Sequence, residues 1–207
     1  GYVNLKNTHY SELNDSITIK SIVYNSEVNG NIQNASLKSD IANFDLTGTY
    51  KRTTMFGEIQ ELIATYVPAL QPGKTNKADV LKMNYQLSFG QTDPLFEIFM
   101  PELMVSPGTR ISGNIDNVTK NITLDVKSDS IRYDDFLFEG TNLGITTSGQ
   151  RLLVNNNMQL ITINDTLKLA NFRINGNTDK NSSTFSILGS ARDSNLTKFE
   201  INCQTNY

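Results

Sequence analysis

The sequence has few of the residues that usually carry out chemistry. In 207 residues there is one cysteine, one histidine and no tryptophan. The single cysteine, Cys203, excludes an internal disulfide and therefore a small secreted fold held together by disulfides. The single histidine, His9, would need a nucleophile and an orienting group at suitable distances to act as a triad base, and we predict that it is not catalytic. We therefore predict a protein that is not an enzyme and that holds no cofactor and no metal ion.

Charge and long apolar runs are also scarce. Charged residues make up 19% of the chain, the net charge is −3, and there is no run of lysine or arginine. This balance argues against a nucleic-acid-binding protein. No apolar run reaches the roughly 20 residues that a membrane-spanning helix needs. The chain begins with Gly1 and has no signal-peptide pattern, so we expect it to be an internal segment of a longer protein.

The residues that are abundant, Asn, Ser and Thr, are typical of strands with one polar face and of turns. Alternation of apolar and polar residues predicts a mainly β fold, because successive side chains of a strand point to opposite faces. The predicted strands include 44–50, 83–89, 122–126, 167–174, 184–187 and 198–203. Pairs such as Asn29-Gly30 and Asn175-Gly176 predict turns between them.

Two short helices are predicted to interrupt the strands. The first, at 54–68, has Thr54 as its N-cap and ends at Pro68; the second, at 93–101, has Asp93 as its N-cap and ends at Pro101. The polar stretch between them is predicted to be a loop. The chain thus reads as one segment of 207 residues with β rungs at 1–53, helical inserts with one strand and a loop at 54–109, and further β rungs at 110–207.

The predicted strands carry more apolar side chains on one face than two short helices can cover. Such a sheet must bury this face between two packed layers, as in a β-sandwich, or curl into an open groove with an apolar interior. Periodicity alone leaves both architectures open. If the groove is correct, the residues expected to line it are Phe44, Leu46, Leu87, Phe89, Leu124, Val126, Leu167, Leu169, Phe185 and Ile187.

Two other candidates for chemistry have simpler structural explanations. Asp134 and Asp135 are adjacent, and adjacent residues of a strand point to opposite faces, so we interpret them as a surface turn and not as a carboxylate pair. Cys203 alternates with Phe199 and Ile201, which predicts a small buried apolar residue and not a nucleophile.

Several passages resemble one known family. The run YVPALQP, the strand MNYQLSF, and the stretch DPLFEIFMPELMVSPGTRISGNID occur in the order of the corresponding elements of the TamB-like translocation and assembly module proteins, of the AsmA-like superfamily. The chain is most similar to the large form found in Bacteroides-type bacteria. At the level of particular sequence motifs, the resemblance covers about residues 60–145.

The resemblance implies an elongated, curled antiparallel or rung-like β-sheet, shaped as a groove or half-pipe. It further implies a periplasmic location, with tethering to the inner membrane through a helix outside this segment. Such a segment would shield the acyl chains of phospholipids on their way to the outer membrane. A partner barrel of outer-membrane assembly would bind regions outside this segment. Two alternatives remain: a docking or chaperone module in outer-membrane protein assembly, and a surface carbohydrate-binding or adhesin domain.

Overall fold

The computed structural model describes residues 1–12, 15–67, 70, 79–191 and 197–206. Within them the chain forms one large β-sheet and two short helices, which confirms the predicted fold class. The helices are α1 (Met55–Ala64) and α2 (Asp93–Phe99). The strands are β1 (Tyr2–Glu12), β2 (Asp15–Asn29), β3 (Ile32–Ser39), β4 (Ala42–Thr49), β5 (Lys82–Phe89), β6 (Leu103–Val105), β7 (Arg110–Asp116), β8 (Asn121–Tyr133), β9 (Phe136–Ser148), β10 (Arg151–Ile163), β11 (Leu167–Thr178), β12 (Ser182–Ala191) and β13 (Lys198–Asn206).

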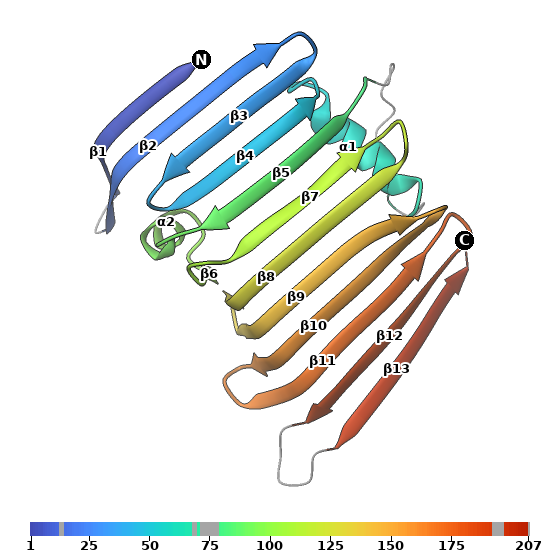
Figure 1. The fold of residues 1–207 in the computed structure, drawn as a ribbon. Helices are drawn as coiled ribbons and strands as arrows, with labels where there is room; N and C mark the ends of the chain where they lie inside the picture. Colours follow the sequence, from blue (N-terminus) through green and yellow to red (C-terminus); the bar gives the residue numbers. More distant parts are fainter. Residues whose placement is uncertain (13–14, 68–69, 71–78, 192–196, 207) are drawn as a thin grey trace.

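The order of the strands in the sheet is the order of the strands in the sequence. Each strand pairs antiparallel with the next, from β1 at one edge to β13 at the other, and only β6 leaves this path to pair with β8. Figure 1 shows this succession of hairpins, with the two ends of the chain at opposite edges. The sheet does not close into a barrel. Of the two architectures that the sequence left open, the open, curled sheet is the one observed.

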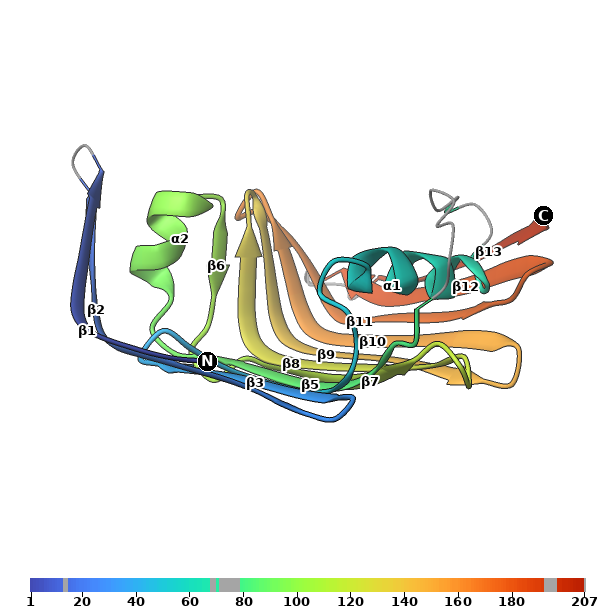
Figure 2. The same ribbon diagram turned by 90° about the horizontal axis from the view of Figure 1, so that it is seen from above.

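The sheet is sharply bent along one side (Figure 2). Three strands contain a residue in the left-handed region at the bend: Asn7 of β1 (φ 50°), Gly140 of β9 (φ 60°) and Asn171 of β11 (φ 53°). The pairings on either side of these residues keep the same register with the preceding or following strand. A single left-handed residue turns β1 and β9 without shifting their pairing, whereas the pairing of β11 with β12 shifts its register between Ala170 and Arg173, on either side of Asn171. Both helices lie on the inner side of the bent sheet, and we call the two faces the inner and the outer face.

Asn171 provides a direct test of this description of the bend. We expect Asn171→Gly to leave the free energy of unfolding nearly unchanged, because glycine adopts a positive φ without strain. We expect Asn171→Val to lower it by about 1–3 kcal/mol, since a β-branched residue is strained in the left-handed region. The side chain of Asn171 is exposed, so packing contributes little to the difference. Urea unfolding of both variants measures the effect, and equal stability of the two would contradict this role of Asn171.

The first helix has the predicted N-cap, whereas the N-cap of the second lies one residue earlier than predicted. Thr54 is the N-cap of α1, but its hydroxyl donates to Asp79 Oδ2 at 3.0 Å and makes no capping hydrogen bond. The N-cap of α2 is Thr92 and not Asp93, because the carbonyl of Thr92 accepts the first helical hydrogen bond, from the Phe96 amide. The Thr92 hydroxyl donates a hydrogen bond to the Val105 carbonyl at 3.1 Å. The predicted end of the first helix at Pro68 and most of the predicted loop, 71–78, lie outside the described residues.

The stretch between α2 and β7 is stabilised by a buried cluster of hydroxyl groups. The hydroxyl of Thr109 lies 2.6 Å from Ser128 Oγ on β8, and Ser106 Oγ lies 3.2 Å from both of these oxygens. Ser106 Oγ also accepts a hydrogen bond from the Ser130 amide. The turn that precedes β7 is thus fastened to β8, and residues 93–116 serve to position α2 and β6 over the inner face.

Candidate functional site

The inner face carries rows of apolar side chains that run across the strands. Directly paired residues of neighbouring strands point to the same face, so the register identifies the members of each row. One row crosses twelve strands and is interrupted within the sheet by one amide, Asn156. Its members are Val3, Tyr24, Leu37, Phe44, Leu87, Ile111, Val126, Leu143, Asn156, Ile174, Ile187 and Ile201.

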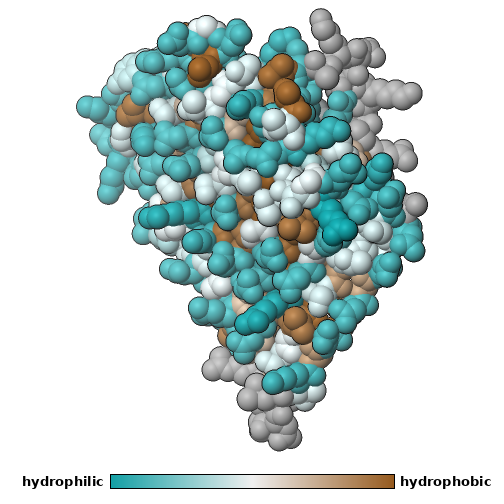
Figure 3. Space-filling view, turned by 45° about the vertical axis from the view of Figure 1, so that its right-hand side comes forward, coloured by the Kyte–Doolittle hydropathy of each residue, from teal (hydrophilic) through white to brown (hydrophobic). Residues whose placement is uncertain are grey.

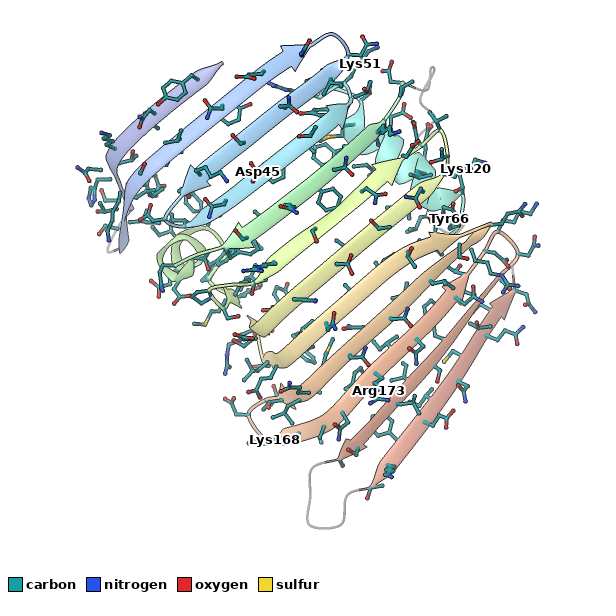
Figure 4. All side chains as sticks on the ribbon, viewed as in Figure 1. Asp45, Lys51, Tyr66, Lys120, Lys168 and Arg173 are labelled. Atoms are coloured by element: carbon teal, nitrogen blue, oxygen red, sulfur yellow. The ribbon has the colours of Figure 1, made fainter. Side chains whose placement is uncertain are left out.

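The outer face is polar along the same strands. Figure 3, which views this face obliquely, shows a mostly hydrophilic surface with small, separate apolar spots. Asp45 of β4 and Arg173 of β11 both belong to this face, and Figure 4 shows them on the side of the sheet away from α1. One outer row consists of Ser36, Asp45, Gln86, Ser112, Asp125, Gly144, Asn155, Asn175, Ser186 and Asn202. The sheet therefore has an apolar inner face and a polar outer face.

The structure brings eight of the ten predicted groove residues together on the inner face. Four of them belong to the long row described above: Phe44, Leu87, Val126 and Ile187. Leu46, Leu124 and Phe185 belong to the neighbouring row toward α1, and Phe89 lies on the other side, with its ring 6.3 Å from that of Phe96 on α2.

The other two predicted residues, Leu167 and Leu169, lie apart from these eight. They belong to the bent part of β11, beyond Asn171, where they pair with Ile163 and Ile161 of β10. Leu167 is exposed and Leu169 is half-buried. The alternation from which they were predicted changes phase at Asn171, so they do not continue the rows formed by Ile174 and its neighbours.

Helix α1 covers one end of the inner face and forms the core there. Leu62 and Tyr66 cluster with buried residues of the sheet, among them Leu46, Met83 and Ile115. The hydroxyl of Tyr66 donates to the Lys120 carbonyl, and Figure 4 shows the two residues together at one end of α1. Burial raises the pKa of the Tyr66 phenol above its ordinary value, because the charged phenolate would be poorly solvated there.

The first turn of α1 is anchored by a buried carboxyl group. Glu58 is 3% exposed, and its two carboxyl oxygens accept hydrogen bonds from the Asp79 amide at 2.7 Å and from Asn117 Nδ2 at 2.9 Å. The same Asn117 side chain also donates to the Asp79 carbonyl and accepts from the Leu81 amide. These bonds hold the segment entering β5 against the helix, so α1 is held in place over the inner face of the sheet.

The inner face at β11–β13 is less covered. Phe185 of β12 is 37% exposed and Ile201 of β13 is 49% exposed, although both point to the apolar side. A side chain at position 176 would collide with the Phe185 ring, so the absence of one leaves room for that ring. This region offers apolar surface to a ligand.

The remaining candidates are all exposed side chains. His9 is exposed on β1, where its Nδ1 lies 3.1 Å from Thr18 Oγ1. Asp134 and Asp135 are exposed in the turn between β8 and β9, and Asp134 has a φ of 52°, as the turn interpretation predicts. The prediction for Cys203 was wrong: this residue is exposed, because β13 is the edge strand of the sheet that the described residues form.

The part of the chain that the structure describes has neither a metal-binding cluster nor a membrane-spanning helix. No group of three or more His, Cys, Asp or Glu residues there is placed to hold a metal ion. Neither α1 nor α2 is long and apolar enough to cross a membrane.

The sequence signals recovered some of the inner-face residues and missed others. Ile111, Leu143, Ile174 and Ile201 were not predicted, although all four belong to the long inner row. The period-2 alternation in FEINC would have identified Ile201.

Comparison of the chain with protein-family models, with curated proteins and with solved structures found no match in any of the three.

Proposed function

We propose that this chain is a periplasmic segment of an envelope-spanning bridge, resembling the TamB-like proteins, whose inner face shields the acyl chains of phospholipids in transit to the outer membrane. The observation that carries the proposal is the long apolar row on the inner face, which stays apolar across nearly every strand while the outer face is polar. At the usual spacing of paired strands such a row is about 50 Å long.

The energetics of the sheet suit this role. Each acyl methylene removed from water contributes about 0.8 kcal/mol, and the contribution has no preferred direction along the row. A chain can therefore slide from strand to strand without a large change in free energy. The polar head group would remain at the open side of the sheet, in contact with water.

The least covered part of the inner face is where lipid binding would be measured. Phe185→Asp with Ile201→Asp places two carboxylates on the exposed inner face of β12 and β13. Since burial of each of these side chains is worth about 1.5–3 kcal/mol, loss of either contact should weaken acyl-chain binding by about tenfold or more. Ser186→Asp with Asn202→Asp is the matched control, because it adds the same charge to the same two strands on the outer face.

The measurement uses phosphatidylcholine vesicles that contain a lipid with a pyrene-labelled acyl chain. Extraction of the labelled lipid by the protein lowers the excimer emission of the vesicles. We expect the wild-type chain and the outer-face control to extract lipid and the inner-face variant to extract at least tenfold less, with all three folded by circular dichroism. Equal extraction by both variants, or none by the wild type, would argue against the proposal.

A second candidate function, docking of other β-proteins, is favoured by the two open edges of the sheet. β1 and β13 each pair on one side only. Exposed strand edges bind extended segments through backbone hydrogen bonds. A proline on an edge strand should abolish such docking while leaving acyl-chain extraction at the inner face intact.

A further inference from the structure

Two buried polar atoms of the inner face have no hydrogen-bond partner in the part of the chain that the structure describes. They are Thr141 Oγ1 on β9 and Asn156 Oδ1 on β10. Thr141 is 8% exposed, and Asn156, the one amide in the long apolar row, is half-buried. Buried polar atoms of folded proteins are nearly always hydrogen-bonded, because burial without a partner is unfavourable. A pair of such atoms on an apolar face is suited to a polar group of a ligand.

The two side chains are neighbours on adjacent strands. Asn156 is paired with Leu143 on one side and with Ile174 on the other, so its direct neighbours are apolar. Thr141 lies two residues before Leu143 on β9 and therefore points to the same face. Thr141 and Asn156 are thus diagonal neighbours across the β9–β10 pair, about 7–8 Å apart. One small polar group can lie between the hydroxyl and the amide and contact both.

The nearest hydroxyl groups are already engaged with one another. Thr141 pairs with Ser128 of β8, whose Oγ lies 2.6 Å from Thr109 Oγ1 and donates to the Ser130 carbonyl at 2.9 Å. Thr109 in turn donates to the Ser106 carbonyl at 2.8 Å. The hydroxyl cluster that holds the turn before β7 therefore ends at Ser128 and does not include Thr141.

We propose that Thr141 and Asn156 bind a hydroxyl group carried on an acyl chain, so that the inner face favours lipids with a hydroxylated acyl chain. The inference rests on the proposed function, because it takes the inner face to hold acyl chains. A hydroxyl group suits both side chains, since it donates to Asn156 Oδ1 and accepts from the Thr141 hydroxyl. A carbonyl oxygen would satisfy Thr141 alone, and a methylene group would satisfy neither. A chain that slides along the long row can bring its hydroxyl group to this pair.

Urea unfolding checks that the Thr141 hydroxyl has no partner within the chain. Thr141→Val should leave the midpoint of unfolding unchanged or raise it, because the variant loses a buried hydroxyl and no hydrogen bond. Ser128→Ala should lower the midpoint, because the Ser128 hydroxyl is bonded to Thr109 and Ser130. Equal lowering by the two variants would show that Thr141 is bonded within the chain, and would overturn the inference.

Two fatty acids that differ by one hydroxyl group, ricinoleate and oleate, test the preference itself. Each is used to displace a pyrene-labelled fatty acid from the purified chain, with displacement followed by fluorescence. We expect ricinoleate to half-displace the label from the wild type at a concentration about tenfold below that of oleate, because it gains two hydrogen bonds. In Thr141→Val/Asn156→Leu this difference should vanish. Thr146→Val/Asn157→Leu is the matched control, because it makes the same changes on the outer face of the same two strands, and it should keep the difference.

The possible outcomes separate this inference from the proposed function. Equal displacement of the label from the wild type by both fatty acids, as expected if the two atoms bind only a water molecule, would overturn the inference and leave acyl-chain binding intact. Loss of the preference in the outer-face control as well would also overturn it. If the wild-type chain, folded by circular dichroism, did not bind the labelled fatty acid at all, both the inference and the proposed function would be wrong.

Discussion

Replacement of Leu62 by alanine should lower the free energy of unfolding by about 2–5 kcal/mol, the range measured when a fully buried leucine is truncated. Leu62 is 3% exposed and is the point at which α1 enters the core formed with Leu46, Met83 and Ile115. Its loss leaves a cavity between a helix and a sheet, and neither can move far, because both ends of α1 are hydrogen-bonded to strands or to the segments beside them. Urea unfolding followed by circular dichroism measures the change.

The matched control lies on the same helix. Phe56 is 72% exposed, so Phe56→Ala removes a larger side chain but little buried surface. We expect its effect to remain within about 0.5 kcal/mol, as for other exposed positions. If Phe56→Ala were as destabilising as Leu62→Ala, α1 would have to pack through its other side, and the inner-face core described above would be wrong.

Replacement of Glu58 by alanine should also be severe, although it removes no apolar contact of comparable size. The change leaves the Asp79 amide and Asn117 Nδ2 without their acceptor at a site that is 3% exposed. Each buried donor that loses its acceptor costs about 1–3 kcal/mol, which gives roughly 2–6 kcal/mol for the two together. Differential scanning calorimetry would record the loss as a fall in Tm.

Glu58→Gln separates the hydrogen bonds from the volume of the side chain. The amide oxygen of glutamine can still accept from the Asp79 amide, whereas its NH₂ group cannot accept from Asn117 Nδ2. We therefore expect a loss about half that of Glu58→Ala. Full stability of Glu58→Ala would show that Asp79 and Asn117 find other acceptors, and that the carboxyl group does not hold α1 to the sheet.

Much of the fold could be predicted from the sequence because most strands obey one simple rule. In MNYQLSF the apolar residues occupy every second position, and β5 occupies Lys82–Phe89. The helix containing Leu62 could also be predicted, because its apolar residues recur at helical spacing. The openness of the sheet could not be predicted from the sequence, because an alternating strand has the same pattern in a sandwich and in a groove.

The bend illustrates what was present in the sequence but not recognised. In β11 the apolar positions change from odd, as in Leu167 and Leu169, to even, as in Phe172 and Ile174, and Asn171 lies at the change. A change of phase within a continuous strand indicates that the strand turns there, because the set of residues facing one side has switched. Gly140 occupies the equivalent position in β9, where Phe138 is followed by Leu143.

Other errors came from tertiary contacts that local patterns do not encode. Thr92 became the N-cap of α2 although Asp93 and Pro94 favour a later start, because its hydroxyl bonds to Val105, thirteen residues away. Cys203 was expected to be buried because it alternates with apolar residues, but alternation does not reveal that β13 is the edge of the sheet.

Organic extraction of the purified chain, followed by mass spectrometry, shows whether the inner face holds acyl chains. We expect phospholipid in near-stoichiometric amount with the wild type and with the Ser186→Asp/Asn202→Asp control, and its loss from Phe185→Asp/Ile201→Asp. Wild-type protein free of lipid, purified without detergent from cells that contain abundant phospholipid, would contradict this expectation.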